Sequence, residues 1–243
     1  MTLNAALAAS ATLIAFAFAL STWDRWLRRR RPHELAWAVS LALFGVGSGA
    51  LWWAESRGWS NESFKVFFLA GAILNVPFLA LGSVYIQFGT RVGHHVRAWL
   101  VLLSGFAAGV ILVAPQKYEI SGDELPTAKE VFGVAPRVLA AVGSGVPATF
   151  IFVAALWSAW RIARRKSPSM ASGVQRNLQS PGRLATGNIL IALGTAILSA
   201  SGSLAGRLGE DRAFAVTLLA GVTVLFLGFL VATSATKKPS LQP

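Results

Sequence analysis

The sequence predicts an all-α integral membrane protein with seven transmembrane helices in one domain, residues 1–243. Of the 243 residues, 54% are hydrophobic and 13% are charged, and the mean hydropathy is +0.58. Soluble domains carry about 25% charged residues. Apolar runs of the length that spans a bilayer recur along the chain, and the charged residues lie between these runs or at their ends. These observations exclude a soluble enzyme and a disordered tail.

The apolar runs define the expected spans in chain order. The first run has no charged residue before its arginine cluster, which distinguishes it from a cleavable signal peptide and predicts a retained first helix. Trp and Tyr residues concentrate at the ends of the runs, where amphipathic rings sit at headgroup depth. The expected spans are 4–22, 35–54, 64–87, 97–115, 137–160, 185–206 and 213–234.

Basic residues concentrate in alternate connections between these spans. The first, third and fifth connections and the C-terminal segment hold 15 basic and two acidic residues, whereas the other three connections hold seven basic and eight acidic residues. Cytoplasmic loops are the ones enriched in Lys and Arg. The pattern therefore predicts an N-terminus outside and a C-terminus in the cytoplasm. The net charge of +12 is a topology signal and does not indicate nucleic-acid binding.

A shift of 150 residues aligns the second and third spans with the sixth and seventh. It places Leu41–Leu43 on Ile191–Leu193 and Phe64 on Phe214. The first and fifth spans then lead two parallel triplets, and the fourth span connects them. This 3+1+3 pseudo-repeat predicts a binding site at the interface between the triplets.

The third span carries the first candidate residues. Pro77 lacks a backbone N–H and frees the carbonyl of Ile73, while Asn75 adds a side-chain amide at the same depth. Polar groups within a membrane usually face the bundle interior or a wet cavity. Two interpretations stay open: a kink sealed by an interhelical hydrogen bond, or a wall that contacts a ligand. In either case we expect Asn75 to face the interior near Pro147.

The fifth and sixth spans are rich in small and polar residues. Pro147 frees a second carbonyl, and such helices either pack closely against protein or line a neutral hydrogen-bonding path. Together with the third span, they supply the expected solute-binding residues: Asn75, Pro77, Ser144, Pro147, Thr149, Asn188 and Thr195.

Other features predict contacts at the periphery. Gly105 and Gly109 have the spacing that lets helices approach closely, and they predict an oligomer contact on the connector span. The residues Thr127–Glu130 have capping-box spacing and predict a short surface helix over the outer mouth. The fifth connection is basic and has no acidic residue, which predicts contact with anionic lipid headgroups or with a cytoplasmic partner. Its basic residues are Arg161, Arg164, Arg165, Lys166, Arg176 and Arg183.

The chain offers no catalytic constellation of converging carboxylates and histidines, and it has no cysteine. We therefore expect no enzyme activity, cofactor or metal. Two functions stay open. One is a passive carrier or channel for a small neutral solute; the other is a non-catalytic membrane subunit or scaffold that binds proteins or anionic lipid. The excess of Arg (16) over Lys (6) is typical of a GC-rich bacterial genome and predicts a bacterial plasma membrane.

Overall fold

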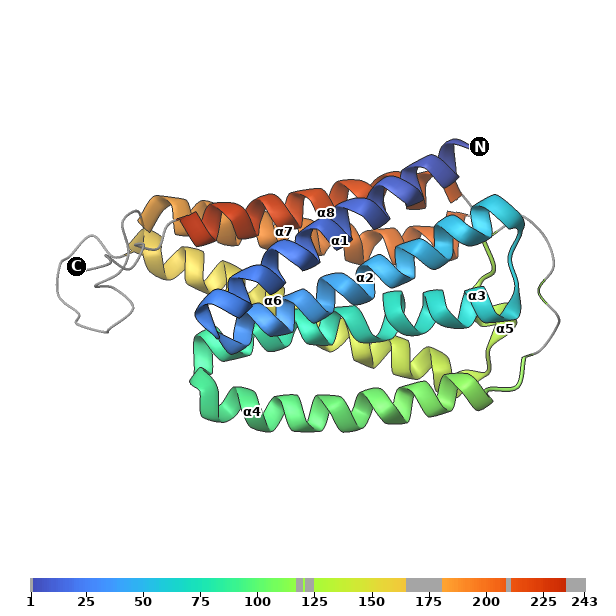
Figure 1. Ribbon diagram of the computed structural model, residues 1–243, viewed down its shortest axis with the longest axis horizontal. Helices are drawn as coiled ribbons and strands as arrows, with labels where there is room; N and C mark the ends of the chain where they lie inside the picture. Colours follow the sequence, from blue (N-terminus) through green and yellow to red (C-terminus); the bar gives the residue numbers. More distant parts are fainter. Residues whose placement is uncertain (1, 117–119, 121–124, 165–180, 209–210, 235–243) are drawn as a thin grey trace.

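The computed structural model describes residues 2–116, 120, 125–164, 181–208 and 211–234, and these are almost entirely helical (Figure 1). The helices are α1 Leu3–Arg29, α2 Pro32–Arg57, α3 Asn61–Val66, the π-helix η1 Phe67–Leu74, α4 Asn75–Val113, α5 Ala128–Val131, α6 Val134–Arg164, α7 Pro181–Leu208 and α8 Asp211–Ser234. Five helical segments in this part of the chain are long and apolar enough to cross a membrane. The predicted class, an α-helical membrane protein, is therefore confirmed.

One helical segment, Asn61–Val113, contains two of the predicted spans. It reverses at Gly89, whose φ of 82° lies in the left-handed region that glycine adopts most easily, and Figure 1 shows α4 turning back at this point. The connection expected between residues 87 and 97 is therefore a turn at one glycine, with helical structure on both sides of it. The second arm ends beside α3, where the Lys65 Nζ donates to the carbonyl of Leu112 at 3.2 Å.

The long helices pack as a closed ring. In order around it, α1 contacts α2, α2 contacts η1 and α4, these contact α6, α6 contacts α7, α7 contacts α8, and α8 returns to α1. α1 begins at one end of the helix bundle and α8 ends at the opposite end (Figure 1). The second arm of α4 lies outside the ring, and large side chains such as Trp99, Leu102 and Phe106 are exposed on it.

Glycines set the closest helix contacts. A Cβ atom at Gly47 of α2 would lie 3.0 Å from the backbone of Gly71 in η1. A Cβ atom at Gly194 of α7 would lie 2.5 Å from the backbone nitrogen of Leu225 in α8. Small residues allow this approach because no side chain separates the two backbones.

The predicted short helix is present as α5, but its end is not on the surface. Val131 and Phe132 are fully buried. The Thr127 hydroxyl donates to the Glu130 carboxylate at 2.5 Å and caps no backbone N–H. The connection that contains α5 is tied to α3 by the Ile120 backbone N–H, which donates to the Asn61 Oδ1 at 3.2 Å.

Candidate functional site

The interior of the ring contains a cavity of about 620 Å³. Its walls come from α2, α3, η1 and α4 on one side and from α6, α7 and α8 on the other. Residues 125–129, which lead into and begin α5, line one end of it. Among the described residues that line the cavity, Lys129 at this end is the one with a charged side chain.

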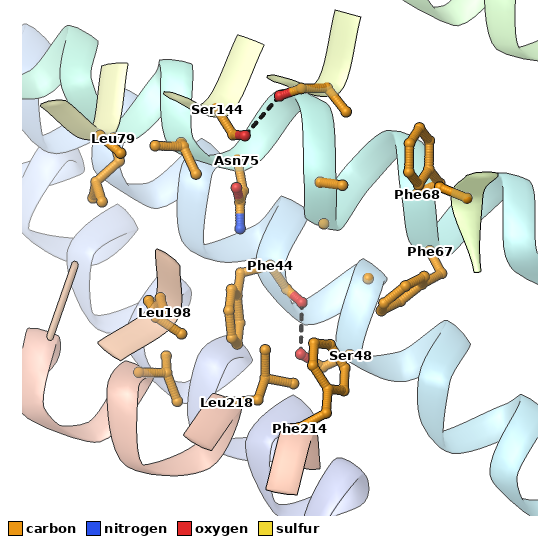
Figure 2. A pocket seen from close by; sticks show the side chains of 18 of the residues that line it. Phe44, Ser48, Phe67, Phe68, Asn75, Leu79, Ser144, Leu198, Phe214 and Leu218 are labelled. Atoms are coloured by element: carbon orange, nitrogen blue, oxygen red, sulfur yellow. Dashed lines mark hydrogen bonds between the residues drawn. The ribbon is translucent and has the colours of Figure 1, made fainter. Parts of the chain in front are cut away.

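Asn75 supplies a side-chain amide to the cavity. Only 8% of this residue is exposed, and Figure 2 shows its amide pointing into the space between the helices. The Asn75 Oδ1 is buried and has no hydrogen-bond partner among the described residues. An unsatisfied buried acceptor costs about 1–3 kcal/mol, so a ligand that donates a hydrogen bond here would recover part of that cost.

The backbone around Asn75 explains why the amide reaches the cavity. The π-helix η1 ends immediately before it, and single turns of π-helix are frequent at functional sites. Pro77 frees the Ile73 carbonyl, and an added Cβ at Gly143 of α6 would lie 3.3 Å from the oxygen of that carbonyl. The Asn75 carbonyl itself accepts a buried hydrogen bond of 2.7 Å from the Ser40 hydroxyl of α2. Asn75 is therefore held between α2 and α6.

Apart from Lys129, the other polar side chains in the described lining carry hydroxyls, and the protons of these hydroxyls are already donated. The hydroxyls of Ser48, Ser144 and Thr195 each donate to the carbonyl four residues earlier in the same helix, at 2.9, 2.6 and 2.8 Å. A hydroxyl that donates in this way still has an oxygen able to accept. Figure 2 shows Ser48 and Ser144 on opposite sides of the Asn75 amide.

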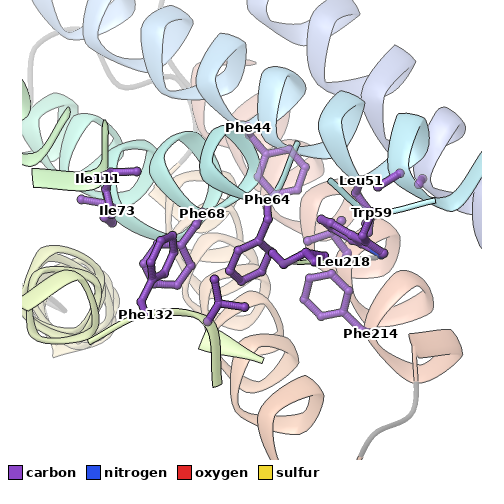
Figure 3. Packing of buried hydrophobic residues seen from close by; sticks show 14 of the residues in the cluster. Phe44, Leu51, Trp59, Phe64, Phe68, Ile73, Ile111, Phe132, Phe214 and Leu218 are labelled. Atoms are coloured by element: carbon purple, nitrogen blue, oxygen red, sulfur yellow. The ribbon is translucent and has the colours of Figure 1, made fainter. Parts of the chain in front are cut away.

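Aromatic side chains form the wall nearest α5. Phe67 of η1 and Phe214 of α8 come from opposite walls of the helix ring. Their aromatic side chains have centroids 6.0 Å apart and an interplanar angle of 76°. Phe64 and Phe68 line the same part of the cavity and pack on Phe132, with centroids 5.4 and 5.1 Å away (Figure 3). The cavity is therefore mainly apolar, with its amide beyond the aromatic wall.

An apolar cluster lies at the other end. Leu79 and Leu225 line the cavity and pack with buried Trp37, Ile151 and Phe229. The Trp37 Nε1 donates to the Leu79 carbonyl at 3.2 Å. The amide of Asn75 thus lies between the aromatic wall and this cluster.

The structure brings three of the predicted solute-binding residues to one cavity, namely Asn75, Ser144 and Thr195. Pro77 and Pro147 are half-buried and do not line it. Thr149 is exposed and donates to the Gly145 carbonyl at 2.8 Å. Asn188 belongs to α7, but its side chain lies outside the described residues.

The sequence reasoning missed the phenylalanines of the wall and the hydroxyls of Ser40 and Ser48. Only the 150-residue shift, which pairs Phe64 with Phe214, pointed toward that wall.

The predicted peripheral contacts lie away from the cavity. Gly105 and Gly109 are exposed on the second arm of α4, and no atom would lie within 4 Å of a Cβ at either position. Arg183 is exposed at the start of α7. Of the remaining basic residues, Arg161 and Arg164 belong to α6 with side chains outside the described set, and Arg165, Lys166 and Arg176 lie outside the described residues.

No group of three or more His, Asp or Glu side chains that could hold a metal occurs among the residues that the structure describes. No protein-family model, curated protein or solved structure matches this chain.

Proposed function

We propose that this chain binds a small uncharged solute in its central cavity and lets the solute cross the membrane down its gradient. The observation that supports this proposal is the cavity of about 620 Å³, which reaches the buried amide of Asn75, whose Oδ1 has no hydrogen-bond partner among the described residues. Small-molecule sites typically have volumes of about 300–1,000 Å³ and combine apolar walls with a few polar groups. A scaffold would need only a dry, packed interior.

The lining favours an uncharged solute. An ion beside Asn75 would lose its hydration and would meet no opposite charge at that depth, a large cost in an apolar environment. The lining residues that the structure describes also include no carboxylate to couple movement to protons or sodium, so the proposed movement is downhill. The proposal includes no catalytic step and no cofactor.

Flux into liposomes tests the proposed function. The full chain is reconstituted, and uptake of short aliphatic amides and alcohols is followed by stopped-flow light scattering. We expect uptake of at least one of these solutes to exceed uptake by protein-free liposomes and to saturate as the solute concentration rises. Uptake equal to that of protein-free liposomes for the whole panel would contradict the proposal.

The proposal also includes a topology of seven spans in a bacterial plasma membrane. The spans are α1, α2, the two arms of Asn61–Val113, α6, α7 and α8, with the N-terminus outside and the C-terminus in the cytoplasm. Labelling can test it, because the chain has no native cysteine. We expect an impermeant thiol reagent added to intact cells to label Asp123→Cys and to leave Arg164→Cys unlabelled. The reverse result would overturn the orientation.

A second proposal concerns self-association through Gly105 and Gly109. Their exposure on the arm outside the ring favours this contact, because no atom of the described residues would lie within 4 Å of a Cβ added at either glycine. We expect Gly105→Leu to weaken crosslinking between copies in membranes while the melting temperature in detergent stays unchanged. Leu103→Ala, exposed on another side of the same arm, is the control and should leave crosslinking intact. If Gly105→Leu crosslinks as well as the native chain does, the proposed self-association through these glycines is wrong.

A further inference from the structure

We propose that Leu225 determines the specificity of the cavity, because it occupies the position on α8 that Asn75 occupies on the other wall. In this arrangement the cavity selects uncharged ligands that have an apolar body and a hydrogen-bonding group at one end only. The inference rests on the proposed binding function and names the chemical class of the ligand.

The sequence register pairs the two walls. α8 contributes four lining residues, spaced by four, four and three positions, and the shift of 150 residues pairs each of them with a lining residue of α3, η1 or α4. The pairs are Phe64 with Phe214, Phe68 with Leu218, Ala72 with Val222, and Asn75 with Leu225. Helical periodicity alone explains why lining residues recur every three or four positions on each wall. It does not require the lining positions of the two walls to match under one shift of 150 residues.

Helix packing agrees with this pairing. If α1, α2 and the first arm of Asn61–Val113 are exchanged with α6, α7 and α8, each contact in the ring falls on another contact. The contact between α1 and α2 then corresponds to that between α6 and α7, and the contact between α1 and α8 corresponds to that of α6 with η1 and α4. This is the arrangement that two related triplets around a two-fold axis would have.

The paired residues also lie at matching depths. Phe64, Phe68, Phe214 and Leu218 share one buried cluster, near α5. Leu225 belongs instead to the apolar cluster at the other end, where Leu79, one helical turn after Asn75, also packs. The amide and the leucine therefore face the cavity near this end, from opposite walls.

The difference between the two walls sets the ligand class. The Asn75 amide can both donate and accept, whereas Leu225 can do neither. A hydroxyl, carbonyl or primary amide can hydrogen-bond to Asn75, and an aromatic or branched aliphatic body that extends from Asn75 toward Leu225 lies among apolar lining side chains such as Phe44. A second polar group placed against Leu225 would give up hydration to lie beside a side chain that can neither donate nor accept a hydrogen bond. A charged group is excluded for the same reason.

Binding of three naphthalene probes to the full chain in lipid nanodiscs tests this inference, with empty nanodiscs as the blank. The probes are 2-naphthalenemethanol, 2-ethylnaphthalene of nearly the same shape, and 2,6-naphthalenedimethanol with a hydroxyl at both ends. For the native chain we expect the mono-alcohol to bind about tenfold more tightly than either of the others, a difference of about 1.4 kcal/mol. Each weaker probe leaves a polar group unpaired, on the protein or on the ligand.

Three variants make the test specific. Asn75→Leu should bind the mono-alcohol more weakly than the hydrocarbon, because the hydroxyl then lies against a side chain that cannot hydrogen-bond to it. Leu225→Asn should bind the diol about tenfold more tightly than the native chain does. The exchange variant Asn75→Leu with Leu225→Asn should recover the native preference for the mono-alcohol, because the amide has only moved to the paired position. Thr149→Val, whose side chain lies away from the cavity, is the matched control and should keep the native preference.

The outcomes separate this inference from the proposed function. The inference is wrong if Leu225→Asn leaves the diol weak, or if the exchange variant loses the preference while it melts at the native temperature. Should Leu225→Asn fail to fold, Leu225→Thr introduces a hydroxyl with less change and should strengthen diol binding in the same direction. Native preferences without any flux in liposomes would retain the inference and overturn the transport proposal. Flux without any of these preferences would do the reverse.

Discussion

Gly194→Val is expected to lower the free energy of unfolding by about 3 kcal/mol, the upper part of the usual range for overpacking. A Cβ at position 194 would lie 2.5 Å from the backbone nitrogen and 2.6 Å from the Cα of Leu225. Real Cβ atoms do not approach backbone atoms so closely, and backbone cannot rotate aside as a flexible side chain can. The substitution therefore forces α7 and α8 apart along the wall that carries Leu225. The melting temperature of the purified protein in detergent measures the effect.

Gly105→Ala is the control for this experiment. It makes the same kind of change on an exposed helix, where nothing lies within 4 Å of the new Cβ. Because alanine favours helix by about 1 kcal/mol over glycine, the control should melt at the native temperature or above it. Equal melting temperatures for Gly194→Val and the native chain would show that α7 and α8 do not pack as closely as described here.

Asn75→Leu is expected to reduce solute flux in liposomes at least about tenfold, because a solute in the cavity would lose its hydrogen bond to the amide. The same substitution should leave the melting temperature unchanged or raise it. The reason is that the Asn75 Oδ1 is buried without a partner, and leucine of similar size removes this cost. When both are measured on one preparation of Asn75→Leu, flux should therefore fall while the melting temperature does not.

Thr149→Val serves as the control for flux and should transport at the native rate, since that side chain is exposed and does not line the cavity. A loss of flux in Asn75→Leu that comes with a comparable loss of thermal stability would assign Asn75 a structural role. Native flux in a well-folded Asn75→Leu protein would separate this amide from the transport path.

The sequence by itself determined the class of the protein and the burial of its most informative residue. The length of a span and the placement of charges at its ends depend on how that one segment fits the bilayer. They can therefore be read from the sequence without knowing which helices are its neighbours. The same holds for Asn75, because an amide exposed to lipid at mid-membrane is costly wherever the other helices lie. The structure accordingly buries it.

Only the tertiary structure decided which side of each helix faces the cavity. Ser144 and Thr149 are five residues apart in α6, yet one lines the cavity and the other is exposed. The sequence could not separate them, because lipid and protein interior are both apolar and a membrane helix needs no hydrophobic stripe to mark its inner face. The aromatic wall and the close contact at Gly194 could not be predicted from the sequence for the same reason. Both depend on the rotation of one helix against another, which packing alone fixes.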